Sequence, residues 1–168
     1  MTKPRLGISA CLMGKAVRYD GSHQLDRFVV DALEQHFSLI PVCPEMDCGM
    51  TVPRESMRLE GDAVAPRLVT VTHRIDRTDQ LERWTQKRIV EMKQEKLTGF
   101  VFKSGSPSCG LAVNIYDTDD GIAGNVAGIF ARRFSSRFSR RLVAEAEQLH
   151  DDSFRKDFIQ RLLTFAQK

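Results

Sequence analysis

The stretch Leu6-Gly7-Ile8-Ser9-Ala10-Cys11, near the start of the chain, is an apolar, strand-like run that ends in small residues and a cysteine. Two later segments share this arrangement. Cys43 follows the apolar run 39–42, and Cys109 follows the run 100–102 through a loop of serine, glycine and proline. Because parallel strands end at one edge of their sheet, residues just beyond three such strands can converge although they are distant in sequence. The sequence therefore predicts a parallel sheet with three cysteines at its carboxyl edge, as a soft metal centre or a thiol catalyst requires.

Strand-like and helix-like segments alternate along the rest of the chain. Short apolar runs predict strands, and apolar residues at helical spacing predict helices. The expected strands are 5–10, 38–42, 68–71, 99–103 and 112–116, and the expected helices are 24–36, 78–96, 125–138 and 151–166. This order predicts a single α/β domain over residues 1–168. Its mainly parallel sheet is flanked by helices in a Rossmann-like three-layer arrangement, with the cysteine site at the C-terminal edge of the strands.

The composition is that of an ordinary globular protein. A chain of 168 residues suits one domain, and 25 basic against 22 acidic side chains leave a formal net charge of +3. This mild balance does not indicate nucleic-acid binding. One basic group is interleaved with Phe134 and Phe138 and consists of Arg132, Arg133, Arg137, Arg140 and Arg141. We interpret it first as the solvated face of a helix with a buried aromatic side, and second as a surface for an RNA backbone.

The chain runs into the strand 5–10 without an apolar leader, and no apolar stretch approaches the length that crosses a bilayer. A cytoplasmic location without membrane contact is therefore expected. In a reducing compartment the four cysteines are expected to be metal ligands, catalytic thiols or inert side chains, and not a disulfide framework. They form no CxxC pair, unlike the cysteines of a zinc ribbon or of a local ferredoxin run.

The loops that carry the cysteines also carry polar side chains suited to catalysis. Glu45 lies two residues after Cys43, where a carboxylate could position or deprotonate a water. Ser106 and Ser108 flank Pro107 beside Cys109, and a hydroxyl there could orient a water or bind a cluster sulfur. Purely structural roles remain open for all three, as a cap, a surface ion pair or a stabilised turn. The segment Arg18-Tyr19-Asp20-Gly21 offers either substrate-facing polar groups or a salt-bridged turn.

Together these loops resemble the thiouracil desulfidase family over about residues 5–130. The matching segments are Ser9-Ala10-Cys11-Leu12-Met13-Gly14, Val17-Arg18-Tyr19-Asp20-Gly21, Cys43-Pro44-Glu45, Pro53-Arg54, Lys103 and Ser106-Pro107-Ser108-Cys109-Gly110. The resemblance implies an oxygen-sensitive 4Fe-4S cluster that is held by three cysteines and leaves one iron without a protein ligand. That iron would bind the sulfur of a thiolated pyrimidine while a water replaces the sulfur, without net redox change.

The resemblance also implies roles for particular residues. The cluster ligands would be Cys11, Cys43 and Cys109, and the catalytic pair would be Glu45 and Ser106. Two further serines, Ser104 and Ser108, remain alternatives to Ser106.

Cys48 departs from the pattern of the family, which has a glycine at this position. It could replace Cys43 as a ligand, bind the fourth iron and block catalysis, or be a bystander. The Cys-Pro-Glu context favours Cys43.

We therefore expect an enzyme that converts 2- or 4-thiouracil, or a related small thiopyrimidine, to uracil and sulfide. An open iron site is a suitable Lewis acid toward a soft thiocarbonyl sulfur. Two alternatives remain. The substrate could be a thiolated nucleoside, nucleotide or tRNA base, or the chain could be a non-catalytic metal or redox-sensing module, which fold alone does not distinguish. The oligomeric state is not specified by the sequence.

Overall fold

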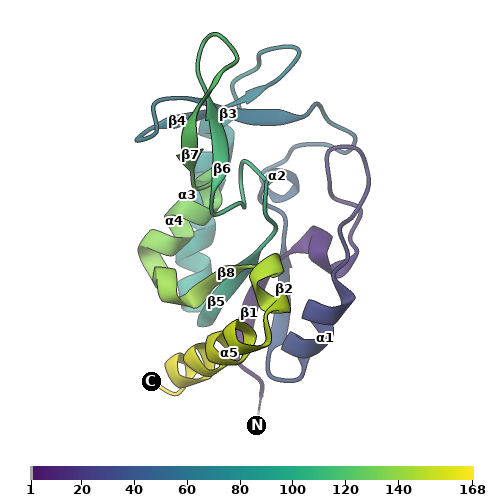
Figure 1. Ribbon diagram of the computed structural model, residues 1–168, viewed down its shortest axis with the longest axis vertical. Coiled ribbons are helices and arrows are strands. Elements are labelled where there is room, and N and C mark those ends of the chain that lie inside the picture. Colours follow the sequence, from purple (N-terminus) through teal and green to yellow (C-terminus); the bar gives the residue numbers. More distant parts are fainter. Residues whose placement is uncertain (1) are drawn as a thin grey trace.

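The computed structural model describes residues 2–168, and within this range it has two four-stranded sheets (Figure 1). In the first sheet, sheet A, all neighbouring strands are parallel. Its strands, in spatial order, are β2 (Ser38–Val42), β1 (Arg5–Ser9), β5 (Leu97–Phe102) and β8 (Val143–Glu145). The second sheet, sheet B, has the order β4 (Pro66–Thr70), β3 (Met57–Gly61), β6 (Val113–Tyr116) and β7 (Ile122–Val126). Only the β3–β6 pair is parallel in sheet B.

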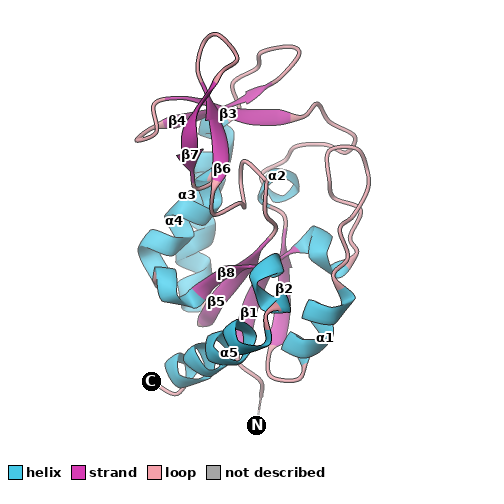
Figure 2. Cartoon of the chain, viewed as in Figure 1, coloured by secondary structure: helices cyan, strands magenta, loops and turns pink. Residues whose placement is uncertain are grey.

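Helices cover both faces of sheet A (Figure 2). One face packs against α1 (Arg27–Glu34) and α5 (Asp152–Ala166), and the other against α3 (Thr78–Gln94) and α4 (Ile129–Phe138). The second face is rich in phenylalanine: the rings of Phe100 and Phe102 stack with centroids 4.4 Å apart, and Phe130 meets Phe100 edge-on. The expected three-layer α/β arrangement is therefore confirmed. No helix in the described part of the chain combines the length and apolar character needed to cross a bilayer.

The helices α3 and α4 also join the two sheets. Near the start of α3, Leu81 packs with Leu59 and Ile115 of sheet B, whereas Ile89 and Met92 further along pack under sheet A. A helix of 17 residues is long enough for both tasks, since it extends about 25 Å. Sheet B is thereby held above the carboxyl edge of sheet A (Figure 1).

Sheet B is the main departure from the expected fold. The expected strands at 68–71 and 112–116 exist, but they belong to this largely antiparallel sheet and not to the parallel one. The expected helix 125–138 is wrong at its start, because β7 occupies residues up to Val126 and α4 begins at Ile129. The expected helix 24–36 is shorter, because Asp26 caps α1 by accepting the backbone N–H of Val29. Strands β3 and β8 and the short helix α2 (Pro44–Asp47) were not predicted.

Strand β3 was missed because it carries two charged residues, which the fold pairs instead of exposing. Glu60 is buried, and its carboxylate accepts hydrogen bonds from Arg58 and Arg74. Arg58 also pairs with Asp120 from the β6–β7 turn. These contacts satisfy charges that would otherwise oppose burial of the strand.

This arrangement predicts an acid-sensitive contribution to stability. Hydrogen bonds from Arg74, and then from Arg58, lower the pKa of Glu60 from 4.5 to about 2. The lowered pKa means that the contribution is complete above pH 4.5 and is lost as the pH falls toward 2. We expect Glu60→Gln to reduce the free energy of unfolding at pH 7 by roughly 1–3 kcal/mol. Urea unfolding from pH 6 to pH 2 should show a shallower decline in the variant, and parallel curves would contradict the prediction.

Candidate functional site

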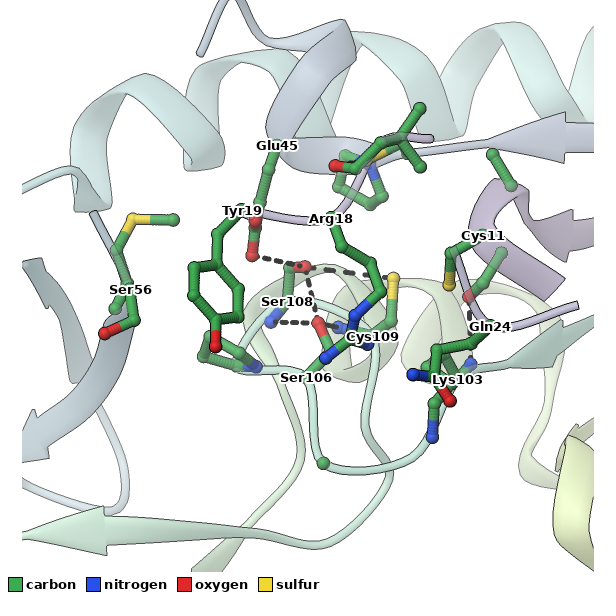
Figure 3. Close-up of a pocket in the computed structure, with 18 of the residues that line it drawn as sticks. Cys11, Arg18, Tyr19, Gln24, Glu45, Ser56, Lys103, Ser106, Ser108 and Cys109 are labelled. Carbon is green, nitrogen blue, oxygen red and sulfur yellow. Dashed lines mark hydrogen bonds between the residues drawn. The ribbon is translucent and has the colours of Figure 1, made fainter. Parts of the chain in front are cut away.

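A cavity of about 320 Å³ lies at the carboxyl edge of sheet A, beneath sheet B (Figure 3). Its walls come from the loops that follow β1, β2 and β5, together with the segments 17–19 and 54–57. Cys11, Cys43 and Cys109 all line it, each as a free thiol. The structure thus brings together the three cysteines that sequence reasoning placed at this edge.

Local backbone structure fixes each cysteine. Cys11 lies in a 3-10 turn (Ala10–Met13), which ends at Gly14 in a left-handed conformation, with φ of 82°. The carbonyl of Cys11 accepts the backbone N–H of Gln24 at 2.9 Å. Cys43 directly precedes α2, and its backbone N–H donates to Asp47 of that helix at 3.2 Å.

The loop that carries Cys109 is bonded to the start of α4. The N–H groups of Ile129 and Ala131 donate to the carbonyls of Pro107 and Ser108, at 3.1 and 3.0 Å. This approach requires a glycine at position 128, since a β-carbon there would lie 2.6 Å from the carbonyl carbon of Ser108. The position of Cys109 therefore depends on α4 as well as on β5.

Cys48 does not belong to the lining of this cavity. It lies at the end of α2, where its sulfur is 3.2 Å from the carbonyl oxygen of Glu45 and its side chain packs against the core under sheet B. Cys43 and Cys48 are the two candidates for the third ligand beside Cys11 and Cys109, and of these only Cys43 lines the cavity.

Glu45 lines the cavity as an almost fully buried carboxylate, 8% exposed. Its Oε2 accepts hydrogen bonds from Nε and Nη2 of Arg54, at 3.0 and 2.5 Å. Arg54 is itself fixed, because it donates to the carbonyl oxygens of Val17 and Thr51 at 3.0 and 3.2 Å. In the sequence, Arg54 belongs to the Pro53-Arg54 motif. Its separation of nine positions from Glu45 does not indicate an ion pair between the two. Arg54 holds one carboxylate oxygen and leaves Oε1 for the serine loop.

Two of the three candidate serines connect to Glu45 (Figure 3). The hydroxyl of Ser108 lies 3.2 Å from Oε1 of Glu45 and 3.0 Å from the hydroxyl of Ser106. The oxygen of Ser106 also accepts the backbone N–H groups of Ser108 and Cys109. By contrast, Ser104 bonds to Glu147 at 2.7 Å and to Lys103. The structure therefore forms a hydrogen-bonded chain from Ser106 through Ser108 to Glu45, and Ser104 is not part of it.

Burial raises the pKa of all three cavity thiols. The pKa of Cys43 rises to about 11, mainly because burial desolvates its thiolate. The same cause raises the pKa of Cys109, and the neighbouring charge of Cys43 adds to it. For Cys11 burial also dominates, while the positive charges of Arg18 and Lys103 oppose it. Because a cationic metal centre deprotonates the thiols that bind it, these buried sulfurs suit ligands better than free nucleophiles.

The donor set fits an iron–sulfur cluster better than a single metal ion. Among residues 2–168, no three His, Cys, Asp or Glu side chains lie close enough to bind one metal ion together. In a cluster the thiolates bind different irons, so they stand further apart than ligands of one ion. The cavity also holds the Nε of Arg18, which is buried without a hydrogen-bond partner in the described residues. A buried polar atom without a partner indicates a site for a further polar group.

The basic residues near α4 have the arrangement of a solvated helix face. Phe134 is fully buried and stacks on Phe138 with centroids 4.1 Å apart. On the outer side, Arg133 pairs with Glu82 at 3.2 Å, and Arg132 donates to the carbonyl of Ala63. The helix-face interpretation therefore holds for Arg132 and Arg133, whereas Arg140 and Arg141 lie beyond α4, in a separate 3-10 turn.

Three comparisons place the chain among known proteins. The sequence profile of the family described as 2-thiouracil desulfurase matches residues 6–147. The uncharacterized protein YbbK of Bacillus subtilis (strain 168) is 28% identical in an alignment 109 residues long, which covers 61% of this chain and 71% of YbbK. The solved structure of the 4Fe-4S-dependent thiouracil desulfidase TudS (DUF523Vcz) has a TM-score of 0.69 and 25% identity, covering 92% of this chain and 98% of TudS.

Proposed function

Because the chain belongs to the 2-thiouracil desulfurase family, we propose that the cysteine-lined cavity is where it removes sulfur from a thiolated pyrimidine. The chain is an iron–sulfur-dependent thiouracil desulfidase, as its family and its similarity to TudS agree. The reaction joins one thiouracil and one water and yields one uracil and one hydrogen sulfide, so no electron donor or acceptor is needed. The observation that carries the proposal is the meeting of three cysteines, Glu45 and the serine loop in one cavity.

Cys11, Cys43 and Cys109 are proposed to hold the cluster. They line one cavity from three separate strand ends, and the cavity lining does not include Cys48. When bound, a 4Fe-4S cluster with one open iron supplies a Lewis acid for the thiocarbonyl sulfur.

Glu45 is proposed to take up the proton of the attacking water. Arg54 fixes its orientation by donating two hydrogen bonds to one carboxylate oxygen. Ser108 connects the other oxygen to Ser106, whose own oxygen accepts two backbone N–H groups. The hydroxyl hydrogen of Ser106 is then directed either along the chain to Ser108 or into the cavity. The hydrogen-bonded chain from Ser106 through Ser108 to Glu45 lets Ser106 orient the attacking water and pass the proton of that water toward Glu45.

The size of the cavity favours a free base as substrate. A volume of about 320 Å³ is at the small end of the range for ligand pockets, roughly 300–1,000 Å³. The same volume would also have to hold the cluster, so we propose that the pyrimidine ring is the part of the substrate that the cavity encloses.

Turnover under anaerobic conditions tests the proposal. Reconstituted holoprotein is incubated in ¹⁸O-labelled water with 2-thiouracil, 4-thiouracil or the matching nucleosides and nucleotides. We expect labelled uracil and sulfide in equal amounts from a free base, and neither product from the apoprotein. Turnover of nucleosides or nucleotides alone would reject the free-base assignment, and no product from any substrate would reject the proposed function.

The contact between the cysteine loop and α4 gives a further prediction. In Gly128→Ala, the new β-carbon would overlap the carbonyl group of Ser108 and push the Cys109 loop away from the cavity. We expect a loss of roughly 1–3 kcal/mol in the free energy of unfolding and less than half of the wild-type iron after reconstitution. Iron per chain and thermal unfolding measure these effects, with Ser136→Ala on the exposed face of α4 as the control. Wild-type iron content in Gly128→Ala would contradict the prediction.

A further inference from the structure

One cationic side chain of the cavity has no role in the account so far. Arg18, Arg54 and Lys103 are the Lys and Arg residues of the lining. Arg54 is held by Glu45, and Lys103 is held by Glu147 and Ser104. The Nε of Arg18 is buried without a partner within the described residues. Figure 3 shows this side chain extending into the cavity on the side of Ser106 and Cys109.

Arg18 is presented by a loop with many internal contacts. Its backbone N–H donates to the carbonyl of Ser22 at 3.2 Å, and its own carbonyl accepts the N–H of Gly21 at 2.9 Å. Asp20 accepts both the N–H and the hydroxyl of Ser22. The loop is also bonded to the catalytic region, because the N–H of Arg54 donates to the carbonyl of Tyr19 at 2.8 Å. The backbone that carries Arg18 is therefore held in place beside the cavity.

Tyr19, the next residue, lines the same cavity but lies at its opening, where it is 42% exposed. In Figure 3 its ring stands on the opposite side of the cavity from Lys103. An exposed aromatic ring at the mouth of a site offers a flat face on which a planar base can stack.

We propose that Arg18 and Tyr19 recognise the pyrimidine ring, with the Arg18 guanidinium donating to the carbonyl oxygen of the substrate and the Tyr19 ring lying against its face. This inference rests on the proposed function. A thiouracil has one carbonyl oxygen besides its thiocarbonyl, and this oxygen needs a hydrogen-bond donor. Arginine provides donors only. The same guanidinium stabilises the negative charge that develops on this carbonyl oxygen as water adds to the ring.

The variant Arg18→Gln tests the contact with the carbonyl. We expect unchanged iron content, a roughly 10- to 100-fold weaker binding of uracil to the holoprotein by calorimetry, and a similar fall in kcat/KM for 2-thiouracil. Uracil binding is a readout that does not depend on turnover. Arg27→Gln, which changes an exposed arginine of α1, is the matched control and should behave as wild type.

A second substrate distinguishes the loss of the contact between Arg18 and the carbonyl oxygen from a general loss of activity. Pyrimidine-2-thione keeps the thiocarbonyl but lacks the carbonyl, so wild type and Arg18→Gln should process it with the same kcat/KM. Tyr19→Phe should bind uracil as wild type does, whereas Tyr19→Ala should bind it more weakly. Wild-type uracil affinity in Arg18→Gln, an equal loss for both substrates, or a loss of iron would overturn the inference. If the wild-type holoprotein desulfurates no thiopyrimidine, the proposed function itself fails, and this result is distinct from the others.

Discussion

Replacing Glu45 by glutamine is expected to leave the cluster in place and to lower kcat for thiouracil by roughly 10²- to 10⁴-fold. Glutamine has nearly the shape of glutamate, but its single amide oxygen can accept from Arg54 or from Ser108 and not from both, and its amide is not a base. The expected loss is large because the carboxylate is buried, oriented by Arg54 and connected to the serine loop. Iron content, the visible absorption of the cluster and steady-state rates under anaerobic conditions measure the two effects separately.

The Glu45 variant also removes the charge partner of Arg54, whose side chain is 9% exposed. An unpaired buried charge is costly, so the thermal unfolding of the variant must be measured beside its rate. Ser106→Ala provides a second test that leaves this ion pair intact and should also reduce kcat. Ser104→Ala is the control, because Ser104 bonds to Glu147 and Lys103 and not to the Glu45 chain. Wild-type rates in both Glu45→Gln and Ser106→Ala would refute the proposed roles of these two residues.

Replacing any one of Cys11, Cys43 or Cys109 by serine is expected to reduce iron from about four per chain to near zero. The three sulfurs line one cavity, and a serine hydroxyl does not supply the soft thiolate that iron–sulfur clusters require. Folding should persist, because the sheet and its helices form a core that does not depend on a metal. Iron and acid-labile sulfide after anaerobic reconstitution, together with circular dichroism, measure both properties.

Cys48→Ser is the matched control for this series, and it is expected to load iron as wild type does. Its sulfur packs under sheet B beside the carbonyl of Glu45 and does not line the cavity. Normal iron in Cys43→Ser with loss in Cys48→Ser would reverse the proposed ligand set.

The centre of the parallel sheet could be predicted because strands β1 and β5 are buried on both faces. Strands of this kind appear as short apolar runs, here 5–10 and 99–103, and each ends where the chemistry of the loop changes to small and polar residues. The convergence of the cysteine loops then follows from the direction of the strands alone. For this reason the sequence alone predicts where the site lies, although it does not predict the contacts within the site.

Sheet B could not be predicted, because its stability depends on contacts between distant segments. In β3, Arg58 and Glu60 have the appearance of exposed loop residues, but Glu60 is buried and Arg58 half-buried, with Arg74 and Asp120 as their partners from distant segments. Strand β7 is half-exposed and lacks the alternation that marks a strand, and its last two residues fall within the predicted helix 125–138. Strand β8 has only three residues, too few for a periodic signal.

Within the site, the sequence predicts which residues carry the chemistry but not which side chains they bond to. Arg54 lies nine positions after Glu45, and only the fold of the intervening loop makes it the partner of that carboxylate. Likewise, the sequence leaves Ser104 and Ser108 as alternatives to Ser106. Side-chain contacts distinguish them, since Ser108 bonds to Glu45, Ser106 bonds to Ser108, and Ser104 bonds to Glu147.

The central claim is that this cavity holds a four-iron cluster, and the most direct test is the amount of iron and acid-labile sulfide per chain after anaerobic reconstitution. We predict about four of each, the composition of a 4Fe-4S centre. Zinc in place of iron, or folded protein that binds neither metal, would contradict the account.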